Sequence, residues 1–109
     1  MPWQVDFFQN NRGDYPVKDF IEKLDQNLYM KVFRYIDLIS NYGPHLKPPF
    51  VKKIYDQIWE LRITGKTQVR VLYIYFNNAF YLLHAFVKKT QKTPSSEIKV
   101  AIDRANKIL

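Results

Sequence analysis

The residues best suited to chemistry are cations in the C-terminal part of the chain. Arg70 lies in a segment that otherwise contains Val, Leu, Ile and Tyr, where a charged side chain needs an anionic partner. Lys88, Lys89 and Lys92 follow the next apolar segment. Such cations can bind a phosphodiester and stabilise the charge that develops when the 2′-hydroxyl of RNA attacks the adjacent phosphorus. The alternatives are a structural ion pair of Arg70 with Glu60 and a solvated lysine run.

Five further residues are candidates, each with an open alternative. Arg62 precedes a loop that allows two registers, so the sheet face on which it lies is undecided. Lys52 and Lys53 could contact phosphates or be solvated. Phe86 is close to the lysines and could stack on a base. His84 lies in an apolar strand, where it is either a core histidine with satisfied hydrogen bonds or a proton shuttle.

Charge is distributed unevenly along the 109 residues. The net charge is +7, with −1 in residues 1–46 and +8 in residues 47–109. A one-sided positive field raises the local concentration of polyanions, so nucleic acid or an acidic protein is the expected partner. The alternative is a generically basic surface without a specific partner.

Composition argues against several classes of protein. The chain has no cysteine, and its two histidines, His45 and His84, are isolated, so we expect no thiol chemistry, no metal and no cofactor. No apolar run approaches the ~20 residues that a membrane span needs, and the first residues do not resemble a signal peptide. We therefore expect a cytoplasmic protein that does not associate with a membrane.

Hydrophobic periodicity predicts the order β-α-α-β-β-β-α. The expected elements are a strand at 3–7, helices from Pro16 and from near Asp25 to Gly43-Pro44, strands at 57–63, 68–76 and 79–87, and a helix with Thr93 as N-cap and Pro94 in its first turn. This order predicts a single α+β domain over residues 1–109, with a small antiparallel sheet packed on an N-terminal helical pair.

A hairpin turn at Asn77-Asn78 predicts the register of the last two strands. It pairs Phe76 with Ala79 and Arg70 with Ala85. The resulting faces are Arg70, Val87 and Lys89 on one side, and Val71, Tyr73, His84, Phe86 and Lys88 on the other. We therefore expect Arg70 and Lys89 to converge.

The order of elements and several local strings resemble the RelE/ParE superfamily, most closely its HigB-like, phage-derived branch. The strings are IWELR at Ile58–Arg62, VRVLY at Val69–Tyr73, LLHAFVKKTQKTP at Leu82–Pro94, and Glu97-Ile98 before the last helix. Glycine is frequent in this family where Ala85 stands here, which is a small departure. The resemblance covers nearly the whole chain.

This resemblance implies a toxin of a type II toxin–antitoxin system that cleaves mRNA on the ribosome without a metal. The implied partners are the ribosome, mRNA and a cognate antitoxin of the helix-turn-helix class. On this interpretation the catalytic candidates are Arg70, Lys89, Arg62 and Lys88, the RNA-binding candidates are Lys52, Lys53, Phe86 and Lys92, and His84 is the candidate proton shuttle. Two other functions stay open: a non-enzymatic DNA gyrase inhibitor like the ParE branch, and a basic RNA-binding module without toxicity.

Overall fold

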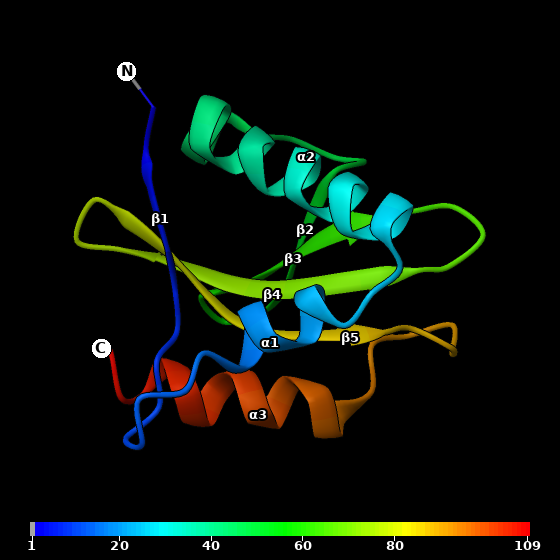
Figure 1. The fold of residues 1–109 in the computed structure, drawn as a ribbon. Coiled ribbons are helices and arrows are strands. Elements are labelled where there is room, and N and C mark those ends of the chain that lie inside the picture. Colours follow the sequence, from blue (N-terminus) through cyan, green and yellow to red (C-terminus); the bar gives the residue numbers. More distant parts are fainter. Residues whose placement is uncertain (1) are drawn as a thin grey trace.

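The computed structural model describes residues 2–109 and confirms the α+β class (Figure 1). Met1, which belongs to the predicted domain, lies outside the described residues. The elements are β1 (Gln4–Phe7), α1 (Pro16–Glu22), α2 (Gln26–Tyr42), a short 3-10 helix η1 (Gly43–His45), β2 (Val51–Tyr55), β3 (Ile58–Ile63), β4 (Val69–Phe76), β5 (Ala79–Val87) and α3 (Ser95–Ala105).

The strands form one five-stranded sheet in the order β1-β5-β4-β3-β2. Strand β1 pairs with β5 in parallel, whereas the other pairs are antiparallel. The prediction of a purely antiparallel sheet was therefore wrong, and β2 was missed. Strand β2 lies at an edge with Lys52 and Lys53 exposed, so it lacks the dense apolar pattern of an inner strand.

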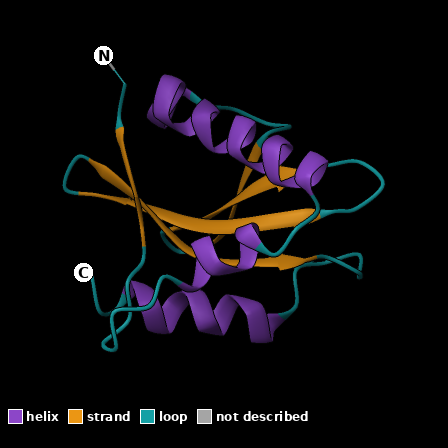
Figure 2. Cartoon of the chain, in the orientation of Figure 1, coloured by secondary structure: helices purple, strands orange, loops and turns teal. Residues whose placement is uncertain are grey.

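Helices cover both faces of the sheet (Figure 2). One core joins α1 and α2 to the sheet through residues such as Ile21, Ile39 and Leu61, all fully buried. A second core joins α3 to the opposite face, with Leu72, Leu83 and Ala101 fully buried. The predicted helical pair thus covers one face only, and α3 covers the other. Burial on both faces explains the near-continuous apolar sequence of β4.

Local signals set most helix ends where the sequence places them. Pro16 is the first residue of α1, and the Asp25 side chain caps α2 by accepting a hydrogen bond from Leu28 N (3.1 Å). Gly43 ends α2 at φ 52°, and a Cβ there would clash with the Trp3 ring. The predicted cap of α3 was wrong by one residue, because Pro94 is the N-cap.

The register of β4 and β5 differs from the prediction beyond the first half of the hairpin. Phe76 pairs with Ala79, as predicted, but a bulge between Tyr73 and Leu72 shifts the pairing by one residue. Arg70 therefore pairs with Phe86 instead of Ala85. Because a shift of one residue exchanges the two faces of a strand, Arg70 lies on the α3 face together with Phe86.

Candidate active site

A basic groove lies where β2, β3, the segment after β5 and the start of α3 meet. Its volume is about 310 Å³. It is lined by Lys52, Lys53, Ile54, Glu60, Arg62, Lys88, Gln91, Lys92, Thr93 and Ile98. Five of these side chains are cationic and one is a carboxylate, so the groove presents an excess of positive charge to a ligand.

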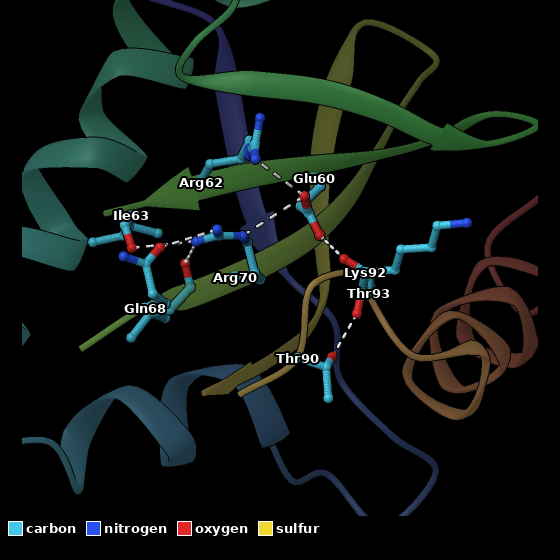
Figure 3. Close-up of polar contacts among 9 residues, drawn as sticks. Glu60, Arg62, Ile63, Gln68, Arg70, Thr90, Lys92 and Thr93 are labelled. Carbon is cyan, nitrogen blue, oxygen red and sulfur yellow. Dashed lines mark hydrogen bonds and ion pairs between the residues drawn. The ribbon is translucent and has the colours of Figure 1, made fainter. Parts of the chain in front are cut away.

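Glu60 lies at the base of this groove and is the centre of its polar contacts (Figure 3). Its side chain is 2% exposed. Glu60 Oε1 is 3.7 Å from Arg62 Nε and 3.7 Å from Arg70 Nε. Glu60 Oε2 accepts a hydrogen bond from the Thr93 hydroxyl. One buried carboxylate thus connects two strands to the segment before α3.

Arg70 is held by the protein itself. Its side chain is 4% exposed, its Nη1 donates to Val69 O (3.0 Å), and its Nη2 donates to Gln68 Oε1 (3.1 Å). Burial lowers the pKa of Arg70, and the nearby Glu60 opposes this effect. The sequence left open whether Arg70 is catalytic or forms a structural ion pair with Glu60. The structure contains the ion pair. A guanidinium in this position can shape the groove but does not line it.

Arg62 is directly opposite Arg70 in the β3–β4 register, which places both on the same face and resolves the ambiguity left by the loop. Its side chain is 34% exposed. Within residues 2–109, Arg62 Nε has no hydrogen-bond partner and faces Glu60 only as an ion pair. Figure 3 shows a terminal nitrogen of Arg62 pointing away from Glu60. Arg62 is thus available to a ligand in the groove.

Lys88 enters the groove directly after β5 and is half-buried. Its backbone N–H donates to Gln68 O (2.7 Å), which extends the sheet by one pair. Burial lowers the pKa of Lys88, and so do the charges of Arg70, Arg62 and Lys52, against the opposite effect of Glu60. A lysine with a lowered pKa can lose and regain a proton nearer to neutral pH, as acid–base catalysis requires.

The other predicted lysines are distributed around the groove. Lys52 lies opposite Glu60 in the register of β2 and β3. Lys92 is exposed on the side of the groove that the segment before α3 forms. Lys53 also contributes to the lining, although its partner in the register is Trp59. Lys89 is exposed and is not among the lining residues, so its predicted convergence with Arg70 was wrong. The bulge in β5 is the cause, because it brings Lys88 to this face instead.

Phe86 and His84 belong to the packing between the sheet and α3. Phe86 is 6% exposed and stacks on His84, so its ring is not available to a base, contrary to the prediction. His84 Nε2 is 2.7 Å from Glu97 Oε1, and neither residue lines the groove. These contacts fit the alternative of a satisfied core histidine. Arg104 adds a hydrogen bond to Leu83 O (2.8 Å).

Four polar residues of the site were not named as functional candidates from sequence. Glu60 was considered only as a structural ion-pair partner of Arg70, and Thr93 was assigned to helix capping. Gln68, at the start of a predicted strand, and Gln91 carried no signal because uncharged polar residues are common. Thr93 and Gln68 gain their roles from partners far along the chain or across a strand pair. Only the tertiary structure brings them together.

The fold and the groove define a small α+β protein with a cluster of basic side chains beside its sheet. Among residues 2–109, no group of three or more His, Cys, Asp or Glu could hold a metal ion, and no helix is long and apolar enough to cross a bilayer. Residues 19–106 match the family model described as phage derived protein Gp49-like (DUF891).

The chain therefore belongs to the Gp49-like family of phage-derived proteins, a toxin-like family related to RelE and HigB. A search among curated proteins found no match.

Proposed function

We propose that this protein is the toxin of a type II toxin–antitoxin system and that it cleaves mRNA on the ribosome. The observation that carries the proposal is the basic groove, in which Arg62, Lys52 and a half-buried Lys88 surround a space of about 310 Å³. Membership of a toxin-like family supports the same conclusion.

The proposed reaction is cleavage of RNA by its own 2′-hydroxyl. The 2′-oxygen attacks the adjacent phosphorus, the bond to the 5′-oxygen breaks, and the products are a 2′,3′-cyclic phosphate and a 5′-hydroxyl. Lys88 in its neutral form accepts the proton of the 2′-hydroxyl, which its lowered pKa favours, and the departing 5′-oxygen takes a proton from solvent water. Arg62 and Lys52 bind the phosphate oxygens and stabilise the charge that develops on them. No metal is required by this arrangement of charges.

The remaining candidates have supporting parts in this proposal. Lys92 and Lys53 extend the positive surface along the RNA backbone, and the exposed Lys89 contacts phosphates outside the groove. Arg70 acts through its ion pair with Glu60. The ribosome holds the mRNA strand in place, which offsets the lack of a strong general base.

We also propose that a cognate antitoxin of the helix-turn-helix class silences the protein in the cytoplasm. Because the net charge is +7, an acidic surface on such a partner would raise the rate of association. Control by a tight partner is needed because a ribonuclease that cuts mRNA on translating ribosomes harms the cell that makes it.

The test uses purified protein, ribosomes programmed with a defined mRNA, and primer extension to locate cuts. We expect discrete cuts in wild-type reactions, with 2′,3′-cyclic phosphate ends. The double variant Lys88→Ala with Arg62→Ala should lose at least a hundredfold in rate, since each change removes a group that acts on the scissile phosphate. Lys18→Ala, which removes an exposed lysine on α1, is the matched control. Intact mRNA together with inhibited DNA gyrase would replace this proposal with the ParE-like function.

A further inference from the structure

The segment Lys88–Thr93 connects β5 to α3 and carries three lysines. It is attached to the sheet at both ends. At the first end Lys88 N donates to Gln68 O. At the second end the Thr93 hydroxyl donates to Glu60 Oε2, as Figure 3 shows. Between them the Thr90 hydroxyl donates to Lys92 O at 2.6 Å, a contact that stays within the segment. The Thr93–Glu60 hydrogen bond is therefore the polar attachment of the second end, beside the packing of α3 on the sheet.

The Thr93 hydroxyl contacts a distant strand and not the first turn of α3. A threonine at an N-cap usually accepts a hydrogen bond from a backbone N–H of the first turn, but the N-cap here is Pro94 and Thr93 precedes it. Here α3 begins after Pro94, and no side chain caps it. The hydroxyl is directed to a strand residue 33 positions earlier in the chain. The contact thus serves the position of the segment and not the stability of the helix end.

The burial of Glu60 is also hard to explain by folding stability alone. Burying a carboxylate carries a large desolvation penalty, and apolar replacement of buried ion pairs is often neutral or stabilising. Its two oxygens divide their contacts between the arginine pair and Thr93. Arg70 is fixed further by Gln68 and by Val69 O, so the carboxylate lies against a rigid neighbour. A carboxylate held in this way can orient the more exposed Arg62 and the segment together.

We propose that Glu60 and Thr93 are positioning residues: Glu60 orients Arg62 toward the bound phosphate, and its hydrogen bond with Thr93 holds the lysine-bearing segment Lys88–Thr93 beside the groove. The inference rests on the proposed function for the reaction that is positioned, but the attachment itself is a property of the free protein. The two can therefore be tested separately.

The first test measures hydrogen exchange of backbone amides in the free, full-length protein. Thr93→Val keeps the side-chain shape and removes the hydroxyl, whereas Thr93→Ser retains it. We expect Thr93→Val to speed exchange of the hydrogen-bonded amides that flank the segment, those of Lys88 and Glu97, at least tenfold, equivalent to about 1.4 kcal/mol of local opening. Exchange in β4 should not change, and Ser should restore the wild-type rate. Thr67→Val, in the exposed β3–β4 loop, is the matched control. Equal exchange in Thr93→Val and wild type would overturn the attachment.

The second test measures cleavage on programmed ribosomes in single-turnover reactions. Thr93→Val should lower the rate about tenfold with ribosome affinity within twofold of wild type, and Thr93→Ser should restore the rate. A purely structural role would change both quantities or neither. Glu60→Gln keeps an acceptor for Thr93 but removes the charge that faces Arg62, so we expect slower cleavage with exchange of these flanking amides within threefold of wild type.

The outcomes separate the two proposals. A wild-type rate in both variants would overturn the positioning role. If the wild-type protein itself cuts no mRNA, the proposed function fails, while the exchange experiment still decides whether Thr93 holds the segment.

Discussion

Arg70 offers the sharpest test of the buried charges, through the substitution Arg70→Met. Methionine keeps the aliphatic stem and removes the guanidinium, so Glu60 loses one of its two ion pairs, and Val69 O and Gln68 Oε1 each lose a donor. Removing one partner of a buried ion pair costs about 3–5 kcal/mol. Because Glu60 keeps Arg62 and Thr93, we expect the lower end, about 3 kcal/mol.

This loss is large for a domain of this length, whose unfolding free energy is on the order of 5–15 kcal/mol. At an unfolding entropy of about 2.1 cal/mol/K per residue, it corresponds to a fall in Tm of roughly 13 °C. The assay is urea unfolding followed by the fluorescence of Trp3 and Trp59, both partly buried. An Arg70→Met protein within about 1 kcal/mol of wild type would refute the reasoning.

A double variant separates the loss of the Arg70–Glu60 ion pair from the cost of leaving the Glu60 carboxylate buried without Arg70. Adding Glu60→Gln to Arg70→Met removes the carboxylate that Arg70 would otherwise leave underpaired. We expect the double variant to be at least about 1 kcal/mol more stable than Arg70→Met alone. Additive losses would mean that Glu60 does not depend on Arg70. Activity of any Arg70 variant has to be measured well below its Tm, because unfolding alone would abolish activity.

Three further predictions concern the groove and its surroundings. Lys88→Ala should lower the cleavage rate at least tenfold. Lys89→Ala should reduce only the salt dependence of ribosome binding, by roughly 0.7–0.9 in the slope of log affinity against log salt. Equal cleavage rates in the two variants would contradict the assignment of Lys88 as the base. Glu60→Gln removes a charge that raises the pKa of Lys88, so the pKa falls and the rising limb of the pH–rate profile moves to lower pH, and an unmoved limb would exclude Lys88 as the base. Phe86→Ala should lower the unfolding free energy by about 3–5 kcal/mol, since the ring is part of the α3 core, and a stable variant that binds RNA poorly would instead support base stacking.

Helix positions could be predicted from sequence because their signals are local. The proline at position 16, the capping carboxylate of Asp25 and the glycine at position 43 each act within a few residues of the helix end. The cap of α3 was misassigned for the opposite reason. The hydroxyl of Thr93 has a distant acceptor, Glu60, that no local pattern reveals.

Sheet details depended on pairings between distant segments and were predicted less well. The parallel pairing of β1 with β5 joins residues that are 75 positions apart, such as Gln4 and Ala79. The bulge near Leu72 leaves no mark in the apolar sequence of β5, yet it exchanges the faces of every residue beyond it. Alternation alone could not reveal that one residue was unpaired.

The candidate site likewise combines features that local sequence predicts with features that depend on distant contacts. Residue type and charge identified Arg62 and Lys88 as catalytic candidates, but the predicted register put Lys88 on the face opposite Arg70 and left the face of Arg62 open. Whether a cation is buried or exposed depends on what packs over it. Arg70 and Lys89 were both expected at the active site, but Arg70 is buried in an ion pair and Lys89 is exposed to solvent outside the groove.

The lysines of β2 have a consequence for solubility. Strand β2 ends the sheet, so its outer backbone N–H and C=O groups are open to pairing with a strand from another molecule. Exposed Lys52 and Lys53 oppose such stacking, because two copies meeting edge to edge would bring like charges together. Removing both charges to weaken RNA binding would thus also promote aggregation. A loss of activity in that double variant bears on the proposed RNA-binding role of these lysines only when the protein remains in solution.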